Sequence, residues 1–184
     1  MFLGVLLLSL ACSSLQHFAC EEELDLGHPH CRRQRPGIRW YYDSEVDMCL
    51  IYYYRGCGGG KNTFITERGC RRKCIPADRI TCAGNEEHKG TCGRKGRSCP
   101  AGSTCRGGNR GILFGFCCDD RREEFWERES NPTCKSGRLL TRTGEWGEEP
   151  VLGRSCSHGF CPLGYECVQG EFLAYCCRKR KIYY

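Results

Sequence analysis

The sequence predicts a small disulfide-rich fold made of three cysteine-rich segments in series, and two observations predict it. The chain carries 19 cysteines in 184 residues, a share typical of secreted domains that are held together by disulfide bonds. After Cys12, the cysteines fall into three successive sets of six. A segment of about 60 residues is only marginally stable on its buried apolar surface, so we expect cross-links to supply the missing stability.

The N-terminus has the composition of a secretion signal. Residues 1–10 are almost entirely apolar, a length that suits a signal peptide and is far short of the ~20 residues of a membrane span. We expect residues 1–19 to form this signal, with cleavage before Ser14 or before Cys20. Either cleavage removes Cys12 and leaves an even number of cysteines, as a secreted disulfide protein requires. A short membrane anchor or a buried helix is the alternative interpretation; the signal predicts a secreted, extracellular protein without a transmembrane segment.

The first cysteine set predicts a hairpin followed by a helix. Residues 39–43 and 50–54 are rich in aromatic and β-branched side chains, which favour strands. Asp43 begins the turn between them. Cys70 and Cys74 are four residues apart, so they would share one face of a helix with Thr66 as its N-cap. The six cysteines are Cys20, Cys31, Cys49, Cys57, Cys70 and Cys74.

Three motifs in this segment carry a resemblance to a known family. They are Cys49-Leu-Ile-Tyr-Tyr-Tyr-Arg-Gly-Cys57, Asn62-Thr-Phe64 and Cys70-Arg-Arg-Lys-Cys74. With them, residues 20–75 resemble a Kunitz domain, the α+β fold of the pancreatic trypsin inhibitor, with a twisted β-hairpin and a C-terminal helix. The resemblance implies the disulfides Cys20–Cys74, Cys31–Cys57 and Cys49–Cys70. It also implies scaffold roles for Tyr41, Tyr42, Tyr54, Asn62 and Phe64, with Asn62 hydrogen-bonded to buried backbone.

The same resemblance implies a function, the inhibition of a serine protease by a rigid loop that enters the active site like a substrate. It places the primary specificity residue directly after the second cysteine, at Arg32, and puts Arg33 across the scissile bond. A long cation suits a pocket with a carboxylate at its base, which indicates a trypsin-like serine protease as the partner. The loop would be supported by Cys31, Cys57, Arg55 and Gly56. Such a protein is not an enzyme and needs no cofactor.

Other functions remain open on the sequence. The segment from Cys31 to Arg39 is two residues longer than the common Kunitz pattern, and Arg33 stands where the family prefers a small residue. The chain could therefore be a non-inhibitory protein of an extracellular matrix or cuticle, or a blocker of ion channels that uses Arg32, Arg33 and Arg35. His28, His30 and Cys31 could be interpreted as metal ligands. A disulfide needs Cys31, however, and a fourth ligand is lacking, so we predict no metal site.

The remaining twelve cysteines form an internal repeat. Cys99-Pro-Ala-Gly-Ser-Thr-Cys105 matches Cys161-Pro-Leu-Gly-Tyr-Glu-Cys167, and each repeat ends in a Cys-Cys pair, 117–118 and 176–177. Residues 80–118 and 132–178 resemble lustrin-type cysteine-rich modules, which often accompany Kunitz domains in nematode-like secreted proteins. We expect each to end in a β-hairpin, with its vicinal cysteines at the crowded centre and bonded to different partners. The pairing itself stays open, because six cysteines allow fifteen connectivities.

Three further segments complete the predicted organisation. Residues 119–131 form a charged linker that is either solvated or folded into one short helix whose Phe125 and Trp126 pack on a neighbour; burial of the aromatics favours the helix. Residues 141–155 are rich in glycine and predict a long exposed loop. The tail 179–184, with the adjoining residue 178, could contact a polyanion through Arg178, Lys179, Arg180 and Lys181. Elsewhere the net charge of +6 is spread along the chain, which does not indicate a nucleic-acid partner.

Overall fold

The fold was analysed in a computed structural model, which describes residues 19–29, 34–77, 79–93, 98–107, 114–144 and 147–180. The chain divides into two compact units. The first holds described residues up to 77 together with 158–160, and the second holds the other described residues from 79 onward. The predicted signal peptide up to residue 18, Cys12 included, lies outside the described residues, and so does Lys181.

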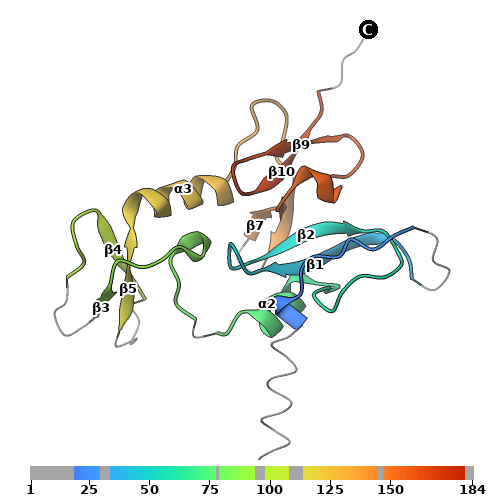
Figure 1. The fold of residues 1–184 in the computed structure, drawn as a ribbon. Helices are drawn as coiled ribbons and strands as arrows, with labels where there is room; N and C mark the ends of the chain where they lie inside the picture. Colours follow the sequence, from blue (N-terminus) through green and yellow to red (C-terminus); the bar gives the residue numbers. More distant parts are fainter. Residues whose placement is uncertain are drawn as a thin grey trace, which may run out of the picture. The chain divides into compact units, whose positions relative to one another are not determined.

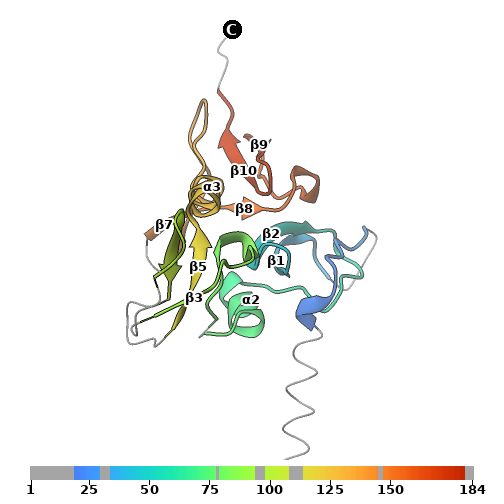
Figure 2. The ribbon, with the colours of Figure 1, turned by 60° about the vertical axis from the view of Figure 1, so that its left-hand side comes forward.

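The first unit is a twisted hairpin with a helix packed against it (Figures 1 and 2). Strand β1 (Gly37–Asp43) pairs antiparallel with β2 (Met48–Tyr54), in a register that places Gly37 opposite Tyr54 and Asp43 opposite Met48. The Asp43 carboxylate accepts the backbone N–H groups of Glu45 at 3.1 Å and Val46 at 3.4 Å, which fixes the turn. The predicted hairpin is therefore confirmed, and both strands are longer than the aromatic runs.

Helix α2 (Glu67–Cys74) follows the hairpin and is joined to it by disulfides. The Thr66 hydroxyl accepts the Gly69 N–H at 3.1 Å and caps the N-terminus, as expected. Cys70 and Cys74 are its buried residues, because side chains at i and i+4 share one face. Their partners are Cys49 and Cys20, which are the two pairings that the Kunitz resemblance implies for these four cysteines.

The core of this unit is made of aromatic and aliphatic side chains. Tyr52 and Leu50 are fully buried, and the Tyr41 ring meets the Tyr52 ring edge-on with centroids 5.8 Å apart. Burial raises the pKa of Tyr52, while a hydrogen bond with Thr63 acts the other way. Large apolar side chains thus supply much of the buried surface of this unit, and the disulfides supplement this core.

Each cysteine-rich repeat is built around a three-stranded antiparallel sheet. In the first, β3 (Thr91–Cys92), β4 (Ser103–Arg106) and β5 (Gly115–Asp119) lie in the order β3-β5-β4. In the second, β8 (Leu152–Gly153), β9 (Tyr165–Gln169) and β10 (Ala174–Arg178) lie in the order β8-β10-β9. The central strand carries the Cys-Cys pair in both cases. The expected terminal hairpins are β4–β5 and β9–β10.

The vicinal cysteines have different partners, as the sequence predicts, and all four are buried at the centre of their repeats. Successive residues of a strand point to opposite faces, so the two sulfurs of one pair reach different loops. The six bridges of the two repeats are Cys82–Cys118, Cys92–Cys105, Cys99–Cys117, Cys134–Cys177, Cys156–Cys167 and Cys161–Cys176. Both repeats therefore join their cysteines in one order: first to sixth, second to fourth and third to fifth.

Helix α3 (Asp120–Ser130) ties the two repeats together within the second unit (Figure 1). Of the two alternatives for this linker, the helix with packed aromatics is the one found. Trp126 is buried and lies against Phe172, with ring centroids 5.2 Å apart. On the other side it lies so close to Gly84 that a Cβ there would be 1.8 Å from the indole. Near the C-terminal end of the helix, the Glu129 carboxylate accepts the N–H groups of Phe172 and Leu173 at 2.9 and 3.0 Å.

The segment 141–155 is not the long exposed loop that its glycines suggest. It forms a further hairpin in the second repeat, in which β6 (Thr141–Gly144) pairs with β7 (Gly147–Pro150), and this hairpin is followed by β8. Cross-strand polar pairs hold this hairpin: Arg142 bonds Glu149 at 2.7 Å, and the Thr141 hydroxyl donates to Glu148 at 2.6 Å. The hydrogen bond from Thr141, and then one from Thr143, favour the charged form of the Glu148 carboxylate and lower its pKa. The prediction was wrong because strands held by polar pairs show no apolar alternation.

Candidate functional site

The candidate site is the segment that follows Pro29 in the first unit. The predicted inhibitory residues Arg32 and Arg33, with His30 and Cys31, lie outside the described residues. The chain on both sides of them, residues 25–29 and 34–36, is described, as is the stretch 54–59 that supports it. The site is therefore built here from its flanks, and the roles of Arg32 and Arg33 stay predictions.

A short backbone ladder fixes the chain before the loop. His28 and Cys57 exchange both of their backbone hydrogen bonds, at 2.8 and 2.9 Å, and Arg55 donates its N–H to the carbonyl of Leu26 at 2.9 Å. Cys57 is buried and is bonded in a disulfide; its predicted partner, Cys31, is outside the described residues. Three backbone bonds therefore hold residues 26–28 against 55–57, directly before the segment that carries Arg32.

Gly27 and Asp25 complete this ladder. Gly27 has φ +69°, and a Cβ there would lie 2.3 Å from the Cys57 carbonyl oxygen, so only glycine fits. The Asp25 carboxylate accepts the N–H of Gly27 at 2.8 Å and that of Gly59 at 3.0 Å. Our sequence prediction did not include either residue. The Asp-x-Gly spacing is a signal for an Asx-turn and could have indicated both.

Tyr54 connects the two flanks of the loop. Its ring is buried, and its hydroxyl oxygen lies 2.6 Å from Gln34 Oε1 and 2.8 Å from each of the carbonyl oxygens of Gly56 and Gly58. A hydroxyl has one proton, so it donates to one of these acceptors at a time. The guanidinium of Arg39 lies 5.8 Å from the centre of the Tyr54 ring. Tyr54 thus anchors the residues that follow the loop to those around Cys57.

Gly56, which the resemblance makes a support of the loop, has a backbone conformation that favours glycine. Its φ is +119°, and a Cβ there would lie 3.4 Å from the Gln34 carbonyl oxygen and 3.5 Å from Pro36 Cγ. Gln34 and Pro36, which lie between the loop and the start of β1, are therefore packed on the turn 55–58. Arg55, the other predicted support, contributes its backbone N–H, and its side chain is exposed.

The other predicted scaffold residues lie at the centre of the first unit. Asn62 is 2% exposed; its side-chain oxygen accepts the Tyr42 N–H at 2.8 Å, and its amide donates to the Tyr42 carbonyl at 2.8 Å. This is the contact with buried backbone that the resemblance implies. Phe64 exchanges two backbone bonds with Trp40, at 2.7 and 2.8 Å. These contacts close the segment after Cys57 onto β1 and so hold the whole frame of the loop.

Glu22 secures the start of the same frame. Its carboxylate accepts the Lys61 backbone N–H at 2.6 Å, and the Lys61 ammonium lies 3.4 Å away. The backbone hydrogen bond, more than the charge of Lys61, lowers the pKa of Glu22. The Asn62 amide also donates to the Glu22 carbonyl at 2.9 Å. Residues 61–62 are thereby fixed to the N-terminal segment that begins at Cys20.

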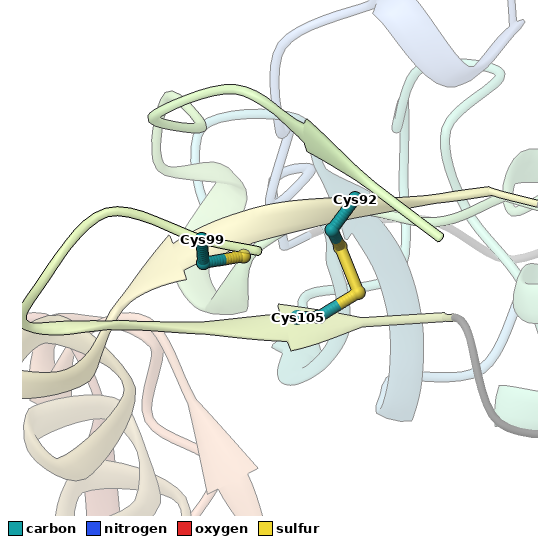
Figure 3. Close-up of side chains that lie close together, drawn as sticks. All are labelled: Cys92, Cys99 and Cys105. Atoms are coloured by element: carbon teal, nitrogen blue, oxygen red, sulfur yellow. A yellow bond between two sulfur atoms is a disulfide. The ribbon is translucent and has the colours of Figure 1, made fainter. Parts of the chain in front are cut away.

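Two groups of residues have the proximity of metal ligands but not the chemistry. The sulfurs of Cys92, Cys99 and Cys105 lie within 4.8 Å of one another (Figure 3), and so do the ligand atoms of Cys82, Cys118 and Glu123. All five cysteines are in disulfides. A metal needs thiolates, so neither group is a metal site while its bridges are intact.

The C-terminal tail begins at the end of β10. The backbone N–H groups of Arg178 and Lys179 donate to Arg138 and Gly164 at 2.9 Å each, and the side chains of residues 178–180 are exposed. Their contact with a polyanion stays a prediction. Among the residues that the structure describes, no helix is long and apolar enough to cross a membrane.

Comparison with known proteins identifies the first unit and extends to the second. Residues 19–75 match the family described as "Kunitz/Bovine pancreatic trypsin inhibitor domain". A BPTI/Kunitz inhibitor domain-containing protein of Caenorhabditis elegans is 39% identical over 165 residues, which are 89% of this chain and 92% of that protein. The chain belongs to the Kunitz/bovine pancreatic trypsin inhibitor family. Proteins of this family are not enzymes; they typically bind serine proteases, and the disulfide-rich members are typically secreted.

Two other relatives of this Kunitz protein show how far the likeness extends. Major allergen Ani s 1 of Anisakis simplex, another nematode, is 32% identical over 183 residues, 92% of each chain. Kunitz-type protease inhibitor 2 of Mus musculus is 41% identical over 44 residues, which are 24% of this chain and 17% of that protein. The nematode relatives therefore share the cysteine-rich region as well as the Kunitz domain. The lustrin-type assignment of that region stays a prediction.

Proposed function

We propose that this Kunitz protein inhibits a trypsin-like serine endopeptidase, with Arg32 in the specificity pocket and Arg33 across the scissile bond. The observation that carries the proposal is the frame on both sides of these residues. Residues 26–28 are paired with 55–57, and Tyr54 links Gln34 to Gly56 and Gly58. A loop whose two ends are fixed in advance pays little ordering cost on binding, which favours a tight complex.

The name of one relative supports the same activity. The mouse protein is called a Kunitz-type protease inhibitor, and the matching segment covers 24% of this chain. The charge of Arg32 then supports the choice of target, because an arginine matches a pocket with a carboxylate at its base and makes charge-assisted hydrogen bonds there.

The test is a titration of the secreted, fully oxidised chain against trypsin and other trypsin-like endopeptidases. Arg32→Glu would place a carboxylate in an acidic pocket, so the inhibition constant should rise at least about a thousandfold. Arg35→Ala is the matched control: it removes another arginine of this region, one whose side chain is exposed, and it should change inhibition little. Arg33→Ala should keep or tighten inhibition, because the family prefers a small residue there.

Two other outcomes of this titration would change the proposal. If Arg32→Glu inhibits as well as the parent, the scissile bond lies elsewhere in the lengthened loop, and Arg35 becomes the next candidate for the specificity residue. No inhibition by the parent at micromolar concentration would overturn the proposal and favour a matrix or cuticle protein. Tyr54→Phe tests the frame itself: it removes the hydroxyl and keeps the buried ring, and it should weaken inhibition about tenfold.

We also infer the organisation of the whole chain. It has a signal peptide at 1–19, a Kunitz domain at 20–75, lustrin-type repeats at 80–118 and 132–178, a linker at 119–131 and a tail at 179–184. The apolar N-terminus and the even cysteine count after its removal support this layout. N-terminal sequencing of the secreted protein and its mass after alkylation without reductant test it. A mature chain that retains Cys12, or that takes up one alkyl group, would contradict it.

A further inference from the structure

The outer face of helix α2 carries a cluster of arginines. Arg68, Arg71 and Arg72 are exposed, and their spacing of i, i+3 and i+4 places them side by side on one turn, about 5–6 Å apart at Cβ. The buried Cys70 and Cys74 lie on a different side of the same helix. The three guanidinium groups are therefore presented to solvent together. We call this surface the α2 arginine face.

Few neighbouring charges neutralise this face. The acidic residue of the helix, Glu67, is half-buried and lies 3.8 Å from Arg71, whose side chain is exposed to solvent, so this ion pair neutralises one of the three arginines only in part. Among the described residues, no carboxylate lies within 4 Å of the side chains of Arg68 or Arg72. The exposed Lys73 adds a fourth cation to the same turn. The face therefore holds an excess of positive charge over a small area.

The position of Arg68 opposes the stability of the helix. It is the second residue of α2, near the positive end of the helix dipole, where a cation is unfavourable. It also stands at i, i+4 to Arg72, a like-charge spacing that destabilises a helix. Because Arg68 weakens α2 on both counts, the arginine cluster calls for a reason outside the fold.

The frame beneath the cluster is rigid. A helix of eight residues is unstable in water by itself, but α2 is bonded to Cys49 and to Cys20 by disulfides and is capped by Thr66. The backbone that spaces the three arginines is therefore set before any ligand arrives. A ligand would have to order only the side chains, which lowers the cost of binding.

We propose that the α2 arginine face binds a sulfated polysaccharide. Guanidinium groups bind sulfate by paired, charge-assisted hydrogen bonds, and a polymer with a sulfate on successive sugars can engage several arginines of one helical turn at once. Such polymers are abundant outside cells, where disulfide-rich Kunitz proteins are typically found. This binding does not rest on protease inhibition; it would hold even if the loop inhibited nothing.

The face is well separated from the loop. Cys49, which holds α2, is at the start of β2, and Tyr54, which holds the loop flanks, is at its end. Five residue steps along a strand span about 17 Å. A polysaccharide on α2 would therefore leave the loop accessible, so that one Kunitz domain could be retained on a matrix and still meet its protease.

The experiment uses the full oxidised chain and heparin as the probe. The triple variant Arg68→Gln, Arg71→Gln, Arg72→Gln should bind immobilised heparin about thirtyfold more weakly, if each exposed contact contributes somewhat under 1 kcal/mol. The matched control, Arg178→Gln, Lys179→Gln, Arg180→Gln, removes the same charge from the tail and should change affinity less than about threefold. N-desulfated and O-desulfated heparin, which keep the carboxylates, should bind the parent much more weakly.

Two further measurements distinguish a loss of binding from a loss of folding. The variant Arg68→Lys, Arg71→Lys, Arg72→Lys keeps the charge and loses the paired hydrogen bonds, so its affinity should fall between the parent and the glutamine variant. Whatever protease inhibition the parent has should be the same in the glutamine variant. No binding by the parent, an equal loss in both triple variants, or a loss in the tail variant alone would each overturn the proposal.

Discussion

The two bridges described in the Kunitz domain follow the order found in the cysteine-rich repeats, but they lie on a different kind of structure. In all three sets, the described bridges link the first cysteine to the sixth and the third to the fifth. In the Kunitz domain, the last two cysteines are four residues apart on α2 and share one face. In the repeats they are adjacent on a strand and point to opposite faces. A shared order of bridges therefore does not define a shared fold.

The two kinds of module also differ in what fills the core. The Kunitz core holds Leu50 and Tyr52, fully buried, with Tyr41 and Trp40 beside them. In repeat 1, the buried apolar residues among those described at 79–107 and 114–119 are all cysteines. The second repeat is intermediate, because Val151 and Leu173 are buried with its cysteines. The disulfides supplement a side-chain core in the Kunitz domain, whereas in the first repeat they are the core.

The largest expected effect comes from removing one bridge from each kind of module. For Cys82→Ser with Cys118→Ser, chain entropy predicts a loss of about 4 kcal/mol, and for Cys49→Ser with Cys70→Ser about 3 kcal/mol. These losses are similar, but the consequences should differ, because only the Kunitz domain keeps an aromatic core. Hydrogen exchange should show β4 and β5 unprotected in the first variant and β1 and β2 still protected in the second. Protection of β5 in the first variant would contradict the comparison.

A smaller effect is expected from the helix that joins the repeats. Trp126→Ala removes the ring that lies against Gly84 and Phe172 and should cost about 3–5 kcal/mol. Because α3 contacts both repeats, exchange should rise in both. Trp126→Phe is the control: the indole N–H is buried without a hydrogen-bond partner among the described residues, so its loss should cost under about 1.5 kcal/mol. A change confined to one repeat would show that the repeats are separate folding units.

The buried amide of the Kunitz domain should matter less than the tryptophan. Asn62→Ala leaves the N–H and carbonyl of Tyr42 without their side-chain partner, at a cost of about 2 kcal/mol. Asn131→Ala is a matched control in the other unit: it removes an exposed amide that donates to the Glu127 carbonyl at 3.0 Å, and it should shift stability by less than about 0.5 kcal/mol. Equal shifts of the unfolding midpoints would show that burial does not set the difference.

The smallest expected effect is a pH dependence at the start of α3. A hydrogen bond from the Lys89 ammonium, and then the Arg122 N–H, hold the pKa of Asp119 below its ordinary value of 3.8. The folded state binds this proton less readily than the unfolded state, so the stabilisation is fully present above pH 3.8 and is lost as the pH falls through the lowered pKa. Asp119→Asn should reduce the difference in melting temperature between pH 6 and pH 3. An unchanged difference would exclude Asp119 as a source of it.

The sequence allowed prediction of those parts that depend on spacing or on local chemistry. The aromatic runs predicted the hairpin, Thr66 predicted the start of α2, and the Cys-Cys pairs predicted the crowded strand centres. The β6–β7 hairpin was missed because its strands are held by hydrogen bonds of Glu148 and Glu149, which produce no apolar pattern. Glu129 was missed as well, because its carboxylate binds backbone N–H groups more than forty residues away, and no local pattern shows such a contact.

The residues of the candidate site also divide into those that the sequence predicted and those that it did not. Tyr54 and Asn62 could be named from the family pattern, and the structure adds what they hold. Gln34 could not be named from that pattern, because its side-chain oxygen meets the Tyr54 hydroxyl, 20 positions along the chain, only in the folded protein. The local spacing indicates the turn that Asp25 makes with Gly27, but not its second partner, the N–H of Gly59, because every residue except proline carries such a group.

The close approach of sulfurs in the first repeat has a consequence for oxidative folding. Cys99 is bonded to Cys117, yet its sulfur lies within 4.8 Å of both sulfurs of the Cys92–Cys105 bridge (Figure 3). A thiolate attacks a neighbouring disulfide through a mixed-disulfide intermediate. If the Cys99–Cys117 bond is reduced, the Cys99 thiolate is within reach of the second bridge, and each exchange frees another thiolate beside it. Reduction of one bond would thus spread as reshuffling through the repeat, and during synthesis the same route would let mispaired sulfurs be corrected without leaving the sheet.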